Sequence, residues 1–169
     1  MNREADIGVL FVCLGNICRS PTAEGVFAAR VAAAGLAPRF RIDSAGTGDW
    51  HLGKPPDPRT QRAARERGYD LEALRARQVR PADFHRFDYI LAMDGANLRD
   101  LERLRPAGFP GRLDLFLRAA GPLAEPEVLE ELEVPDPYGG DASHFEQVLD
   151  LIEQGAERLL AALRTRHGI

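Results

Sequence analysis

Short apolar runs alternate with longer amphipathic segments along the chain. Residues 7–12 form a continuous apolar run, which is typical of a strand that is buried on both faces. Three further apolar runs predict strands, and the segments around them have the residue spacing of helices. We expect strands at 7–12, 40–44, 89–93 and 113–117, and helices at 20–34, 59–67, 96–104 and from Ser143 almost to the end of the chain.

Strands that are separated by helical segments predict an α/β fold, in which a doubly wound, four-stranded parallel sheet carries helices on both faces. The length of 169 residues suits one domain, and we expect a single domain over residues 1–169. Ligands bind such sheets beyond the carboxyl ends of the strands. The loop 13–19 leaves the first strand at that end and contains both cysteines of the chain.

Three polar residues are expected to cap helices. Ser20 stands directly before Pro21, and both residue types favour the start of a helix. Asp94 and Ser143 precede two later helices in the same way. Residues 121–137 are acidic and rich in proline, and no single element is predicted there. The last helix has one apolar face, formed by Phe145, Val148, Leu149, Ile152, Leu159, Leu160 and Leu163.

Composition and charge narrow the classes of function. Hydrophobic residues make up 44% of the chain and charged residues 28%, as in ordinary globular proteins. The formal net charge of −4 argues against nucleic acid as a partner. No apolar run approaches the roughly 20 residues of a membrane helix, and the N-terminus lacks a secretory signal, so no membrane partner is expected. Two cysteines are too few for a disulfide scaffold, which favours a cytoplasmic protein.

The loop between the first strand and the first helix has the residues of an anion site. A Cys that is followed after five residues by an Arg is weak evidence for such a site on its own. Here, however, a buried strand precedes the loop and a helix N-terminus follows it. Such a loop points backbone N–H groups inward, and with the helix dipole these form a cradle for an anion. Gly15 allows a close backbone approach, and Asn16 tolerates left-handed backbone. The cradle is expected to comprise Leu14, Gly15, Asn16, Ile17 and Cys18.

Three side chains of this segment could act on a bound phosphate. Arg19 can grip two phosphate oxygens with its planar guanidinium group. The same positive field favours the thiolate form of Cys13, and the hydroxyl of Ser20 can donate a hydrogen bond to that thiolate. The sequence therefore predicts a loop that binds a phosphate dianion and places a nucleophile under it.

The cysteines allow other interpretations. Both could be small buried hydrophobic residues, with Arg19 as a surface cation. A zinc site needs two further ligands, and the histidines show no ligand spacing, so no metal is expected. His51 is expected to pack locally. Cys18 either forms a reversible disulfide that protects Cys13 or packs as a thiol under the loop, and both interpretations are open.

The stretch VCLGNICRSPTAEGVF at residues 12–27 resembles the low-molecular-weight protein tyrosine phosphatases. Weaker matches follow in order at 44–47, 50–51, 53–59, 88–94 and 134–138, and the similarity extends from about residue 7 to 163. The resemblance implies the phosphotyrosine phosphatase I-like fold, a four-stranded parallel sheet flanked by helices, with neither metal nor cofactor. It also implies a protein substrate that carries phosphotyrosine.

The resemblance assigns roles within the loop and beside it. It implies Cys13 as the nucleophile and Arg19 as the phosphate clamp. Asn16 and Ser20 fall on the family's positions that support the loop, and Ser44 falls on a position that helps to hold Asn16.

The resemblance also implies roles in the second half of the chain. Asp136 falls on the general acid, and Trp50 and Tyr138 fall on the walls of the substrate cleft. The pKa of a phenol lies near 10, so protonation of the leaving group assists the cleavage of an aryl phosphate. Taken alone, Asp136 is better interpreted as an ordinary turn residue between two prolines, and the cysteine loop favours the catalytic interpretation instead. Gly139 stands where eukaryotic members carry a second Tyr, so regulation by phosphorylation there is not expected.

Two charged residues are interpreted as structural. Arg59 is read as a partner in a surface ion pair and Asp94 as a helix N-cap.

Three other functions are less consistent with the sequence. An arsenate reductase on this scaffold needs downstream cysteines, and none follows Cys18. Protein arginine phosphatases carry Thr where this chain has Ile17. A phosphate-binding module without turnover has no need of a nucleophile such as Cys13.

Overall fold

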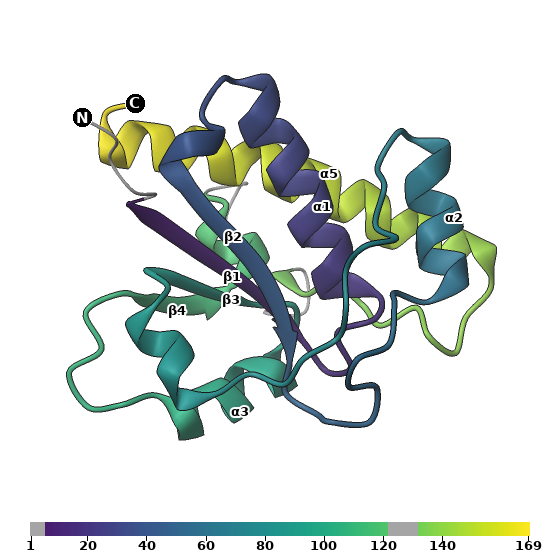
Figure 1. The fold of residues 1–169 in the computed structure, drawn as a ribbon, viewed down its shortest axis with the longest axis horizontal. Helices are drawn as coiled ribbons and strands as arrows, with labels where there is room; N and C mark the ends of the chain where they lie inside the picture. The colour runs from purple at the N-terminus through teal and green to yellow at the C-terminus, as the bar shows by residue number, and fades with distance from the viewer. Residues whose placement is uncertain (1–5, 122–131) are drawn as a thin grey trace.

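The computed structural model describes residues 6–121 and 132–169, and its centre is a parallel sheet (Figure 1). The strands lie in the order β2-β1-β3-β4, and every neighbouring pair is parallel. Their bounds are β1 Ile7–Cys13, β2 Phe40–Gly46, β3 Tyr89–Ala92 and β4 Arg112–Leu115. This confirms the predicted four-stranded sheet. Because the chain crosses from one side of β1 to the other, the loop that follows β1 lies at the topological switch point.

Helices cover both faces of the sheet. On one face α1 (Arg19–Ala33) packs beside α5 (Ala142–His167), with α2 (Pro58–Glu66) against α5, whereas α3 (Gly95–Leu104) lies on the opposite face (Figure 1). Shorter elements complete the described part of the chain: η1 (Ala37–Arg39), η2 (Pro81–His85) and α4 (Phe116–Ala119). None of the helices in the described ranges is long and apolar enough to cross a membrane.

The continuous apolar run of β1 is explained by this double cover. Val9 and Phe11 point into the core that α1 and α5 close, whereas Leu10 and Val12 point into the core beside α3. Phe11 is fully buried and lies edge-on to Phe116, with ring centroids 5.3 Å apart. Each such side chain contributes roughly 1.5–3 kcal/mol to folding, so β1 anchors the sheet and fixes where its final residue lies.

Two predicted helix caps and the ends of several strands differ from the structure. Residue Ser20 does not cap α1, which already begins at Arg19; the Ser20 hydroxyl turns back towards the loop instead. For α5 the cap is Asp141, which accepts a hydrogen bond from the Ser143 N–H group at 2.9 Å. The fourth strand ends at Leu115, because the next residues turn into α4. The N-cap predicted at Asp94 is confirmed, and most of the segment 121–137 lies outside the described residues.

Candidate active site

The loop that leaves β1 borders a cavity of about 160 Å³ at the carboxyl edge of the sheet. Cys13 ends β1 opposite Gly46 of β2, and Arg19 begins α1, so the loop is fixed at both ends by regular structure. Three separate segments of the chain line the cavity. Its walls are Cys13, Leu14, Gly15, Ile17, Cys18, Arg19, Trp50, His51, Asp136 and Tyr138.

The sulfur of Cys13 receives two polar contacts. The Cys13 side chain is almost fully buried, and its Sγ lies 3.0 Å from the Ser20 Oγ. The Asn16 N–H group donates a hydrogen bond to the same sulfur at 3.3 Å. These two contacts fix the position of the sulfur at the border of the cavity.

Asn16 holds the shape of the loop. It has a φ of 56° and is the one non-glycine residue with positive φ in the described part of the chain. Its Nδ2 donates to Ser20 Oγ at 2.8 Å and to Ser44 Oγ at 3.0 Å, and its Oδ1 accepts from the Arg77 N–H group at 3.0 Å. Left-handed backbone costs about 1–2 kcal/mol for such a residue, and these three hydrogen bonds offset that cost.

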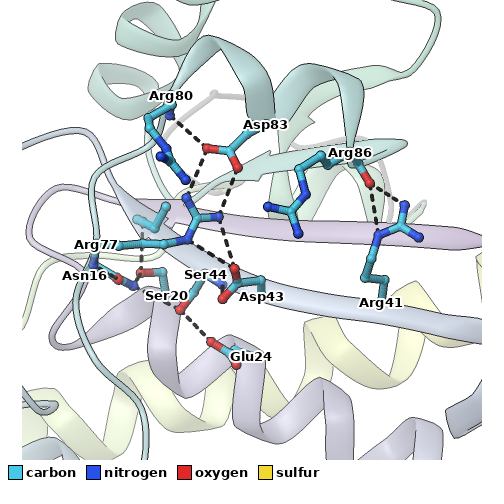
Figure 2. Close-up of polar contacts among 11 residues, drawn as sticks. Asn16, Ser20, Glu24, Arg41, Asp43, Ser44, Arg77, Arg80, Asp83 and Arg86 are labelled. Carbon is cyan, nitrogen blue, oxygen red and sulfur yellow. Dashed lines mark hydrogen bonds and ion pairs between the residues drawn. The ribbon is translucent and has the colours of Figure 1, made fainter. Parts of the chain in front are cut away.

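Behind Asn16 the support continues into a charged cluster, which Figure 2 shows. The Ser44 hydroxyl donates to a carboxylate oxygen of Glu24 at 2.7 Å. Burial raises the pKa of Glu24 to about 7, although the hydrogen bond from Ser44 opposes this rise. The guanidinium of Arg77 pairs with Asp43 and Asp83, each at 3.1 Å. The loop therefore rests on a polar network that spans α1, β2 and the segment before η2.

The side chain of Arg19 lines the cavity and is almost fully buried. Its Nη1 donates to Asp94 at 2.6 Å and to the Val134 carbonyl at 3.0 Å, and its Nη2 lies 3.6 Å from Asp136 Oδ2. Burial opposes the charge of Arg19, but the negative charges of Cys13, Asp94 and Asp136 outweigh it, and the pKa of Arg19 is raised. A buried, permanent cation beside the cysteine is suited to an oxyanion.

The opposite wall is formed by exposed side chains. Asp136 is about half exposed, and its Oδ1 accepts a hydrogen bond from the Tyr138 N–H group at 3.1 Å. Trp50 and Tyr138 border the cavity and are 66% and 52% exposed. His51, which we expected to pack locally, lies in the cavity wall with its ring centroid 6.2 Å from that of Tyr138.

Cys18 differs from Cys13 in its surroundings. It is buried beneath the loop, and burial raises the pKa of its thiol to about 12. Both cysteines are free thiols in the structure. Across residues 6–121 and 132–169, no group of three or more His, Cys, Asp or Glu side chains is arranged to hold a metal ion.

Some residues of the site were not predicted from the sequence. Asp94 caps α3 and also pairs with Arg19; its position directly after a predicted strand is a signal that could have found it. Glu24 and Arg77 carry no such signal, because their partners lie far away along the chain. Arg59, interpreted as a surface ion-pair residue, does pair with Asp57 but also contacts the segment of Asp136.

Comparison with known proteins identifies close relatives. The family model described as low molecular weight phosphotyrosine protein phosphatase matches residues 8–167. A low molecular weight protein-tyrosine-phosphatase from Streptomyces coelicolor is 45% identical over 156 residues, which cover 92% of this chain and 93% of the relative.

Solved structures agree with this result. The crystal structure of a protein tyrosine phosphatase from Entamoeba histolytica, with Hepes in its active site, superposes with a TM-score of 0.84 at 34% identity. The alignment covers 96% of this chain and 99% of that one. The Drosophila arginine phosphatase superposes with a TM-score of 0.82 at 31% identity, over 92% of this chain and 97% of its own.

Proposed function

The chain belongs to the low molecular weight phosphotyrosine protein phosphatase family, and from this premise we propose how its site hydrolyses phosphotyrosine. The protein is a protein-tyrosine-phosphatase, a hydrolase. The observation that carries the mechanism is that Cys13, Arg19 and Asp136 line one cavity although they come from distant parts of the chain.

In the first step, the Cys13 thiolate attacks phosphorus, so that an S–P bond forms while the P–O bond to the tyrosine breaks. Asp136 gives its proton to the departing phenolate oxygen, and tyrosine leaves as a neutral phenol. Arg19 and the N–H groups of residues 14–18 hold the phosphate oxygens while the transferred group changes its bonds. The buried cation of Arg19 and the cysteine sulfur at the end of β1 support this assignment.

In the second step, water releases the phosphate. Asp136, now a carboxylate, takes a proton from water while the water oxygen attacks phosphorus. The S–P bond breaks, which returns the Cys13 thiolate. The contact of 3.0 Å between Ser20 Oγ and Cys13 Sγ supports a role for Ser20 in stabilising this leaving thiolate. The same aspartate therefore serves first as acid and then as base.

The remaining assignments concern the substrate and its environment. We assign the walls of the phenyl cleft to Trp50 and Tyr138, because exposed aromatic rings that border a cavity are suited to stack on another ring. Ser44 supports the loop through Asn16. Cytoplasmic localisation is also a proposal, supported by the free thiols of both cysteines. We further propose that residues 1–169 form one domain, which the family match over 8–167 supports.

Phosphate release from a phosphotyrosine peptide and from a phosphoarginine peptide tests this proposal, with wild type and Cys13→Ser side by side. We expect wild type to release phosphate chiefly from phosphotyrosine and Cys13→Ser to release none while still binding inorganic phosphate. Wild type that is quenched in acid during turnover should carry phosphate on Cys13. Release chiefly from phosphoarginine would contradict the substrate assignment, and binding without turnover by wild type would contradict the enzymatic mechanism.

A further inference from the structure

Arg59 lies where α2 meets the segment that carries Asp136. Its Nη2 donates a hydrogen bond to the Tyr138 carbonyl at 2.9 Å, and its Nη1 lies 3.4 Å from the Gly140 carbonyl. The guanidinium also lies over the rings of Tyr138 and Phe145, with its carbon 5.5 and 4.6 Å from the two ring centroids. One side chain therefore holds both the backbone and the ring of Tyr138.

The other side of Arg59 is tied through Asp57 to the loop of residues 13–19, which is called the phosphate loop below. Two guanidinium nitrogens pair with the Asp57 carboxylate at 3.1 and 2.9 Å, and this hydrogen bonding holds the pKa of Asp57 below its ordinary value. The N–H group of Asp57 donates to the Ile17 carbonyl at 2.8 Å, and Ile17 belongs to the cradle. Asp57 is buried and caps α2, so it is a fixed anchor for the arginine.

These contacts form a path between the two halves of the site. The Tyr138 N–H group donates to Asp136 Oδ1, and the other oxygen of this carboxylate lies 3.6 Å from Arg19. From the loop, the path runs through Asp57 and Arg59 to the backbone that orients Asp136. An ion pair with an exposed partner contributes little to stability. The arginine of this bidentate pair is about half exposed, so the main effect of the pair is to join the two segments rather than to stabilise the fold.

We propose that Arg59 is a positioning residue that sets the distance of the Asp136 carboxyl from the phosphate loop. The proposal rests on the proposed function, because it concerns the proton that Asp136 delivers to the leaving group. It goes further by naming the side chain on which this delivery depends. Arg59 does not line the cavity and acts through Tyr138.

The dependence of the rate on the leaving group separates positioning from general support. The phenolate of phenyl phosphate needs a proton in order to leave. The 4-nitrophenolate of 4-nitrophenyl phosphate leaves readily without one. The value of kcat/KM for each substrate reports the steps up to transfer of phosphate to Cys13. A displaced acid therefore slows phenyl phosphate and spares 4-nitrophenyl phosphate.

We expect Arg59→Gln to lower kcat/KM for phenyl phosphate at least about tenfold and for 4-nitrophenyl phosphate less than about threefold, because small displacements of a catalytic group cost up to about 10²-fold. Arg59→Lys keeps the charge but not the planar fork, so its ratio of the two values should fall between wild type and Arg59→Gln. Arg62→Gln, at an exposed position of the same helix, is the matched control and should leave the ratio unchanged.

A double variant tests whether the effect passes through the acid. When Asp136→Asn has removed the proton donor, adding Arg59→Gln should not change the ratio further. An Arg59→Gln variant that slows both substrates equally, or neither, would overturn the proposal, as would a further change of ratio in the Asp136→Asn background. If wild type hydrolyses neither substrate, the proposed function itself fails, and this result is distinct because it does not involve Arg59.

Discussion

The partly buried carboxyl of Glu24 should make the stability of the protein fall as the pH rises through neutrality. Glu24 lies on α1 behind the phosphate loop, where its carboxylate accepts a hydrogen bond from the Ser44 hydroxyl at 2.7 Å (Figure 2). Burial raises its pKa from the ordinary value of 4.5 to about 7. Asp43 adds to this rise, and the positive charge of Arg77 and the Ser44 hydrogen bond oppose it.

The sign follows from where the proton is held. Between pH 4.5 and 7 the native state keeps a proton on Glu24 that the unfolded chain releases, so a rise in pH favours unfolding. The stabilisation is complete below pH 4.5 and is lost as the pH passes through about 7. At about 1.4 kcal/mol per pKa unit, the rise from 4.5 to about 7 corresponds to about 3 kcal/mol of unfolding free energy.

Urea unfolding of wild type and Glu24→Gln, followed by far-ultraviolet circular dichroism, measures this quantity. Glutamine has nearly the same shape and an oxygen that can accept from Ser44, but it does not titrate. The unfolding free energy of Glu24→Gln relative to wild type should increase by about 3 kcal/mol between pH 4.5 and 8. Glu66→Gln, at an exposed position at the end of α2, is the control and should show no such trend.

A difference between Glu24→Gln and wild type that stays constant over this pH range would refute the reasoning. It would mean that Glu24 ionises at the same pH in the folded and the unfolded chain. A difference that shrinks as the pH rises would be a stronger contradiction, because it would mean that the native state stabilises the carboxylate.

Three further predictions follow from the site and the helix caps. Asp94→Ala leaves the buried charge of Arg19 without its closest partner and should lower the unfolding free energy by about 3 kcal/mol in urea titrations. An unchanged free energy would show that the Val134 carbonyl and solvent are enough to stabilise this charge. Because burial raises the pKa of Cys18 to about 12, iodoacetamide at pH 8 should spare it and alkylate the other cysteine of the loop, as peptide mass spectrometry would show; equal labelling would contradict this. Asp141→Ala should cost about 1 kcal/mol in thermal unfolding and Ser143→Ala clearly less, and the reverse order would restore Ser143 as the cap.

The first strand and the loop after it could be predicted because their signals are local. A run that is buried on both faces must be apolar at every position, and residues 7–12 are. The spacing of the cysteine, the glycine and the arginine predicts an anion site only when a strand precedes the loop and a helix follows it. The structure places these residues around one cavity.

The helix caps show where local signals are insufficient. Ser20 and Asp141 are both ordinary capping residues, yet only Asp141 caps a helix. The Ser20 hydroxyl lies beside Cys13 and Asn16 instead, because the loop folds back over the start of α1. A serine or aspartate at a helix start can cap the helix or bond elsewhere. Contacts with distant parts of the chain decide between these roles, so the neighbouring residues in the sequence do not predict which one is taken.

Pairing among charged residues was decided by the tertiary structure alone. The chain has 22 Lys and Arg residues, all but Lys54 arginines, so the sequence gives no reason to single out Arg77 and marks Arg59 only as a candidate for an ion pair. Arg77 pairs with Asp43 across 34 positions, and Arg19 pairs with Asp94 across 75. The sequence by itself determined the sheet, the loop at residues 13–19 and the family, because apolar periodicity and the loop motif act over short distances. Only the folded chain decided which polar groups support that loop, since a hydrogen bond depends on where its two partners meet in space.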